Sequence, residues 1–190
     1  GNGLLTVKNA GASYLHFLGN EFSWFSTENT WQHINTDNES VTHTQTYLPE
    51  GNSFLHNHSK QLNSSDKWES RNALSVDGAI FSTTNFLNVS YLRNNGFGSA
   101  NSTTANETTK LNALLSRNSF ESSDFNFDFS TGNYVKYITD LIRGDFSVSY
   151  NRNKQKQFML NNIQYFQGGQ PNDYRNNYFD MPNQKLKLSA

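Results

Sequence analysis

The stretch Asp124-Phe125-Asn126-Phe127-Asp128-Phe129-Ser130 alternates without a fault between phenylalanine and small polar residues. Because successive side chains of a β-strand point to opposite faces, this pattern places three phenylalanines on one face and the polar residues on the other. Aromatic residues also favour strands over helices. The stretch therefore predicts a strand with one apolar and one polar face.

The same period of two recurs on both sides of this stretch. Clear runs span residues 85–91 and 145–150, and weaker ones span 41–47, 71–76, 111–115, 134–142, 158–165 and 186–188. Turn-forming residues separate the runs: Asp77-Gly78, Asn94-Asn95-Gly96, Thr131-Gly132-Asn133, Arg143-Gly144, Asn151-Arg152-Asn153 and Gly168-Gly169. Residues 136–143 could form a short helix, but their neighbours favour a strand. We expect an all-β fold, an antiparallel meander of eight to ten strands.

Three long segments show no alternation and predict loops. They span residues 49–67, 93–109 and 167–184, and the last holds two of the three prolines. The links near Asp77, Asn118 and Arg152 look short by contrast. Long loops at one end of a meander and tight turns at the other are typical of outer-membrane β-barrels.

The composition of the 190 residues excludes several classes of protein. A net charge of −1 and the absence of a basic run argue against nucleic acid as a partner. Without cysteine there is no disulfide scaffold, iron–sulfur cluster, cysteine-ligated zinc site or thiol nucleophile. No apolar run approaches the roughly 18 residues of a membrane helix, and no signal peptide opens the chain. The length predicts a single domain.

A sheet with one apolar and one polar face fits either a soluble sandwich or a membrane barrel. A soluble sandwich normally carries Lys and Glu on its water-exposed face, whereas here 28 Asn and 37 Ser or Thr dominate and only 16% of residues are charged. Aromatic residues near the expected strand ends would suit the interfacial girdles of a barrel; they are Phe81, Phe86, Tyr91, Phe120, Tyr150, Phe158, Tyr165 and Phe166. A secreted or surface-exposed β-sandwich that binds glycans or acts as an adhesin stays open, as does a small closed barrel of eight strands.

From about Thr42 onward the chain resembles the TonB-dependent outer-membrane transporters. The resemblance rests on the order of strand-like and loop-like segments and on their composition. It is carried by Thr46-Tyr47-Leu48-Pro49-Glu50-Gly51-Asn52 and the expected strand 67–76, by 85–91 and the Asn/Thr-rich segment 94–109, and by 146–153. Residues 172–176 and 180–182 are similar to loops of that family.

The resemblance implies a part of a 22-stranded barrel that imports a bulky nutrient such as a metal chelate or a glycan. We expect residues 1–190 to form a single β-barrel segment with no plug domain, located in the outer membrane at the cell surface. Its partners would be outer-membrane lipid, the rest of the barrel and its plug, an energy-coupling periplasmic protein and a surface lipoprotein. In this arrangement Phe125, Phe127 and Phe129 face lipid, and Asn126, Asp128 and Ser130 face the lumen.

Candidate binding residues lie in the last predicted loop. Asp173, Tyr174, Arg175 and Tyr178 combine aromatic and charged side chains, the mixture that ligand-binding loops use. Trp24, Trp31 and Trp68 could stack on sugars but better suit a girdle or a core.

His56 and His58 are weak candidates for a metal site, because residues two apart on a strand share a face. His43 and Asp66 would be the first additional ligands to test. The sequence shows no G-x-S-x-G, HExxH or phosphate-binding loop and predicts neither catalytic residues nor a cofactor, so we expect no enzyme.

Overall fold

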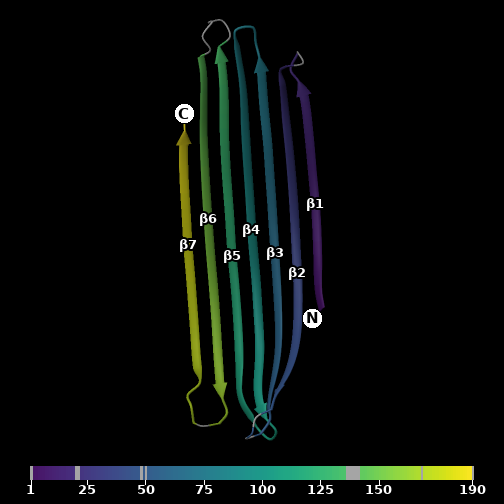
Figure 1. Ribbon diagram of the computed structural model, residues 1–190, viewed down its shortest axis with the longest axis vertical. Helices are drawn as coiled ribbons and strands as arrows, with labels where there is room; N and C mark the ends of the chain where they lie inside the picture. The colour runs from purple at the N-terminus through teal and green to yellow at the C-terminus, as the bar shows by residue number, and fades with distance from the viewer. Residues whose placement is uncertain are drawn as a thin grey trace.

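The computed structural model describes residues 2–19, 22–47, 49, 51–135, 142–167 and 169–189. Every neighbouring pair of strands in one sheet is antiparallel, and the strands follow chain order (Figure 1). The strands are β1 (Asn2–Phe17), β2 (Trp24–Thr46), β3 (Ser53–Asp77), β4 (Phe81–Asn106), β5 (Lys110–Val135), β6 (Ile142–Tyr165) and β7 (Asp173–Ser189). This confirms the all-β antiparallel meander. The described part of the chain contains no helix that could cross a membrane.

The sheet has two ends, which we name by the strands that finish there. β1, β3, β5 and β7 finish at the proximal end, at the top of Figure 1, and β2, β4 and β6 finish at the distal end. The predicted turn at Asp77-Gly78 is confirmed at the proximal end, where the Gly78 N–H donates to the Phe81 carbonyl at 2.9 Å. Gly51 and Gly169 lie in distal turns with φ of 123° and 63°, a region that favours glycine.

The strands are fewer and longer than the sequence predicted. The structure describes seven strands rather than eight to ten, and β2 to β6 have 23 to 26 residues each. The predicted loops were wrong over most of their length: 53–67 belongs to β3, 93–106 to β4 and 173–184 to β7. Most of the ambiguous segment 136–143, from 136 to 141, lies outside the described residues.

Several predicted turns also lie inside strands. Asn94-Asn95-Gly96 is in β4, Asn118 and Thr131-Gly132-Asn133 are in β5, and Arg143-Gly144 and Asn151-Arg152-Asn153 are in β6. At Gly96 the glycine serves a different purpose. A Cβ there would overlap the ring of Phe120, its cross-strand partner on β5. Glycine thus leaves room for the aromatic ring beside the backbone of β4.

The sheet is a single layer without a core. No hydrophobic side chain is buried among the described residues, and no second layer packs on either face. The two edge strands, β1 and β7, do not contact each other among the described residues. The described residues therefore form neither a sandwich nor a closed barrel.

Candidate functional site

The register gives the sheet two faces of different chemistry. Residues directly opposite each other in an antiparallel pair share a face. We call the side of Phe125, Phe127 and Phe129 the phenylalanine face, and the opposite side, with Asn126 and Asp128, the polar face. On the phenylalanine face these rings lie beside Leu87, Val89 and Tyr91 of β4 and beside Val148 and Tyr150 of β6.

An apolar belt crosses the phenylalanine face near the proximal end. Its border row runs across four adjacent strands through Trp31, Trp68, Tyr91 and Phe125. Three further rows follow toward the proximal end, carrying Tyr14, Phe25, Leu74, Leu87, Val89, Phe127, Phe129, Phe146, Val148, Tyr150, Leu186 and Leu188. Four rows spaced two residues apart span about 20 Å. That height approaches the roughly 25 Å apolar band of outer-membrane barrels.

Charge begins immediately distal to the border row. The next row of the phenylalanine face contains Lys8, His33, Asp66, Arg93 and Lys154. His33 Nδ1 lies 2.6 Å from Asp66 Oδ1, and in the row beyond, Glu121 accepts from Arg93 at 2.9 Å. Within the belt the charged residue is Arg152, in the border row.

The pairing of Trp31 with Trp68 could not be predicted from the sequence, because it depends on the register of β2 against β3.

Small polar residues interrupt the belt on β2 and β3, and Asn85 of β4 and Thr131 of β5 interrupt its most proximal row. They are paired along their own strands: Asn29 Nδ2 donates to Thr27 Oγ1, and Asn72 Nδ2 donates to Ser70 Oγ, both at 3.0 Å. Because each amide finds an acceptor on the same face, the cost of removing it from water is reduced.

The polar face carries a ladder of side-chain hydrogen bonds at the level of the belt. Asn126 donates to Ser90 of β4 at 3.3 Å and accepts from Asn151 of β6. Asp128 accepts from Ser149 at 2.6 Å, and Asp124 accepts from Asn153. These bonds link β4, β5 and β6 through groups that the predicted lumen side contributes.

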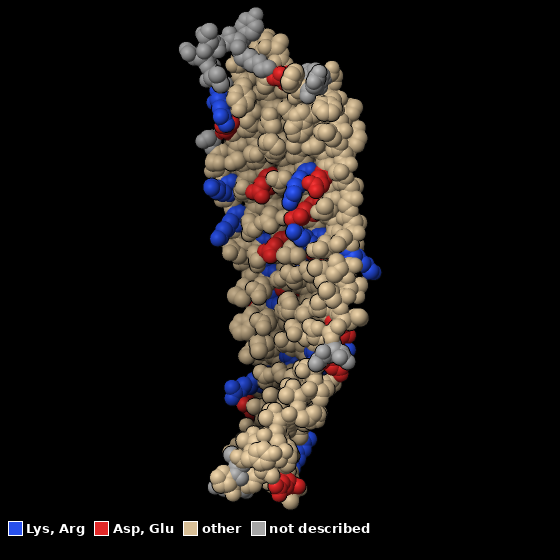
Figure 2. Space-filling view, turned by 45° about the vertical axis from the view of Figure 1, so that its right-hand side comes forward, with Lys and Arg blue, Asp and Glu red and all other residues tan. Residues whose placement is uncertain are grey.

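Ion pairs continue the polar contacts of this face onto β2 and β3. Lys67 lies 2.9 Å from Glu69, and Arg71 lies 3.9 Å from Glu28. In Figure 2 acidic and basic side chains gather in the upper half of the sheet, the level of the belt. A hollow of about 200 Å³ opens there, lined on this face by Glu69, Arg71, Asn88, Ser90, Asn126 and Asp128. The sequence analysis missed Lys67, Glu69 and Arg71, although their alternation with Trp68 and Ser70 marked a two-faced strand.

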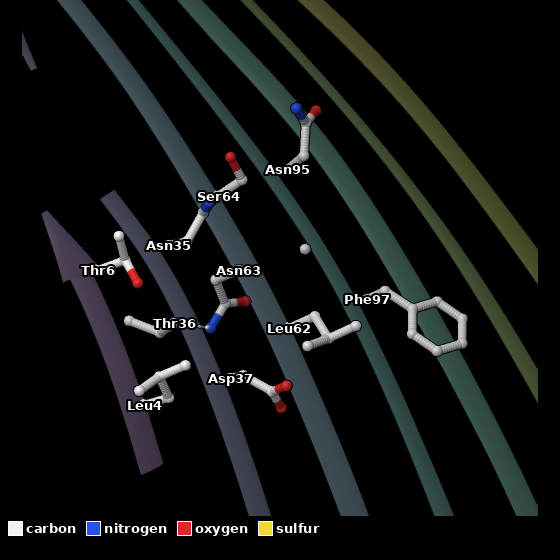
Figure 3. A pocket seen from close by; sticks show the side chains of 11 residues that line it. Leu4, Thr6, Asn35, Thr36, Asp37, Leu62, Asn63, Ser64, Asn95 and Phe97 are labelled. Atoms are coloured by element: carbon white, nitrogen blue, oxygen red, sulfur yellow. Dashed lines mark hydrogen bonds between the residues drawn. The ribbon is translucent and has the colours of Figure 1, made fainter. Parts of the chain in front are cut away.

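A second hollow lies in the distal half and contains both apolar and polar groups. It measures about 410 Å³ and is lined by residues of β1 to β4. Figure 3 shows Leu4, Asp37 and Leu62 on neighbouring strands, with Phe97 on the next. This hollow is open to solvent and contains no group predicted as a binding residue.

The predicted binding residues of β7 do not converge on one site. Asp173 and Arg175 lie on the polar face and form an ion pair, with Arg175 Nη2 2.8 Å from Asp173 Oδ2. The hydrogen bond from Arg175 to Asp173, with the carboxylate charge, raises the pKa of the guanidinium. Tyr174 and Tyr178 lie on the opposite face, 67% and 63% exposed. A ligand-binding role for the four residues stays a prediction.

The histidines predicted as weak metal ligands lie in β3 rather than in a loop. His56 faces His43 of β2, with their Nδ1 atoms 3.1 Å apart, and His58 Nε2 lies 2.6 Å from Glu39 Oε1. Asp66 contacts His33 instead. Over the described ranges, no three or more His, Asp or Glu side chains are grouped to hold a metal ion.

The comparisons with known proteins are weak. No family model and no curated protein matches the chain. Among solved structures, the ferric yersiniabactin uptake receptor FyuA from Yersinia pestis is similar with a TM-score of 0.43 and 12% identity, over 97% of this chain. The chain spans about a quarter (26%) of that receptor. The membrane pore complex of pneumolysin gives a TM-score of 0.16 and 7% identity, over 94% of this chain and 41% of that one.

Proposed function

We propose that this chain forms part of the wall of an outer-membrane β-barrel, with its phenylalanine face against lipid and its polar face toward a water-filled interior. The observation that carries the proposal is the unequal charge of the two faces at the same level. Among the described residues the belt carries one charged residue, Arg152, in its border row. At the same level the polar face carries Glu28, Glu69, Arg71, Asp128, Lys185 and Lys187. A face with a single charged residue at its border is compatible with contact to lipid, whereas a face with many charged residues requires contact with water.

The open edges support a wall completed by further strands. The outer backbone edges of β1 and β7 have no partner strand in the sheet. An unpaired peptide group within the hydrocarbon costs several kcal/mol, so a membrane sheet must close on itself. The segment would therefore have the rest of a barrel and its plug as partners, and residues 1–190 would be a single barrel segment.

The strand lengths fit a tall barrel wall. A strand crosses a bilayer with about 9–11 residues, whereas β3, β4 and β5 have 25 or 26. More than half of each strand would stand beyond the membrane and extend the wall of the interior. From the sequence resemblance we extend the proposal to import of a bulky nutrient in a TonB-dependent manner, with an energy-coupling periplasmic protein and a surface lipoprotein as partners.

Depth-dependent quenching of tryptophan fluorescence tests the orientation. Three single-tryptophan variants of the full chain, keeping Trp24, Trp31 or Trp68 and replacing the other two with Phe, are reconstituted in vesicles of brominated phosphatidylcholine. Trp31 and Trp68, on the phenylalanine face, should be quenched strongly, and Trp24, on the polar face, should be quenched weakly. Equal quenching of all three, or a chain that does not enter the vesicles, would overturn the proposal.

A further inference from the structure

Two histidines face each other across β2 and β3 in the distal half of the sheet. His43 and His56 are direct cross-strand partners on the phenylalanine face, well beyond the apolar belt. Their ring centroids are 4.4 Å apart, the rings are tilted by 40°, and both side chains are exposed. The Nδ1 atoms are 3.1 Å apart, a hydrogen bond when one of them carries a proton. A metal ion that displaces this proton would find two nitrogen lone pairs close together.

The separation of the two nitrogens suits a shared metal ion. Imidazole nitrogens bind Zn²⁺ at about 2.0–2.1 Å, and two such bonds to nitrogens 3.1 Å apart enclose an angle of about 100°. This angle lies between the roughly 90° of square-planar and 109° of tetrahedral coordination. Imidazole is a preferred ligand of Cu²⁺, Ni²⁺ and Zn²⁺, whereas Mg²⁺ and Ca²⁺ prefer oxygen.

The neighbouring groups leave the remaining coordination positions open. His58 lies on the same face two residues along β3, but its Nε2 is held by Glu39 at 2.6 Å. The structure brings no third protein ligand to the pair within the described residues. Water, or donor atoms of an arriving molecule, would complete the coordination.

We propose that His43 and His56 form a two-ligand site for a divalent transition-metal ion of the imidazole-binding class, Cu²⁺, Ni²⁺ or Zn²⁺. A bound ion would cross-link β2 and β3. The site requires only the register of β2 against β3 and not a particular orientation of the two faces, so its failure can be distinguished from failure of the proposed barrel wall.

Calorimetric titration of CuCl₂ and ZnCl₂ into the full chain, purified in detergent and without a histidine tag, tests the site. The wild-type chain should bind one ion, and His43→Gln and His56→Gln should each weaken binding at least tenfold. His33→Gln and His58→Gln are matched controls, since these residues contact Asp66 and Glu39, and both should bind like the wild type. Circular dichroism verifies that each variant keeps its sheet.

Two results would overturn the proposal. Wild-type affinity in both His43→Gln and His56→Gln would show that the ion binds elsewhere. An equal loss in His33→Gln or His58→Gln would show that the pair has no special role. A second measurement follows the linkage between binding and stability: the ion should raise the unfolding temperature of the wild type and leave that of His56→Gln unchanged.

Discussion

At the scale of the residue, the alternation of apolar and polar side chains along a strand places sequence neighbours on opposite faces of the sheet. Phe127 lies in the middle of the apolar belt between Val89 and Tyr150, whereas the next residue, Asp128, accepts a hydrogen bond from Ser149 on the polar face. Neighbours in sequence thus belong to different environments. The same reasoning separates Tyr174 from Arg175, which sequence reasoning had assigned to one binding site.

The pair Phe127 and Asp128 gives a prediction with an internal control. Phe127→Arg should destabilise the membrane-embedded chain by about 2–4 kcal/mol, because it places a charge near the middle of the bilayer. Asp128→Asn keeps an acceptor for Ser149 and should cost little. Urea titration of both variants in vesicles measures the difference, and equal stability of the two would contradict the assignment of faces.

At the scale of the element, the strands continue where the sequence analysis expected loops. Alternation appears only where one face meets an apolar environment and the other meets water. In the distal halves of β3 and β4 both faces are dominated by polar residues, so the period of two disappears although the strand does not. Pro182, in the predicted loop 167–184, lies instead in β7, an edge strand of the described sheet, where a missing N–H is tolerated.

Engineered disulfides test whether 93–106 is a strand in the described register. Ser59 and Ala100 are direct partners on one face, so Ser59→Cys with Ala100→Cys should cross-link readily, since Cα atoms of such partners are about 4.5–5.5 Å apart. The chain has no native cysteine to interfere. Ser59→Cys with Asn101→Cys is the control, because residue 101 points to the other face, and it should remain reduced on a non-reducing gel. A flexible loop would instead cross-link both pairs alike.

At the scale of the whole molecule, the sheet exposes what globular proteins bury. Large apolar side chains such as Leu186 and Leu188 are 65% and 62% exposed, and both edge strands are open. A single layer has no core that could supply the usual burial free energy, so in the proposed barrel wall lipid and neighbouring strands would supply it.

The purified chain should accordingly depend on detergent. We expect it to aggregate without detergent and to run as a heat-modifiable species on a gel after extraction, because lipid-like molecules replace water on the belt. Light scattering with and without detergent measures the first property. A soluble monomer without detergent would contradict the proposed barrel wall.

The sequence by itself determined the fold class and the two faces of the central strands. The run 124–130 shows both, because alternation is a local property that follows from strand geometry. It could not determine how far each strand extends, since Asn, Ser and Thr give no period when both faces meet water. Nor could it align Trp31 with Trp68, or His43 with His56. Those pairings depend on register, and register is set by contacts between residues distant in the chain, which only the tertiary structure decided.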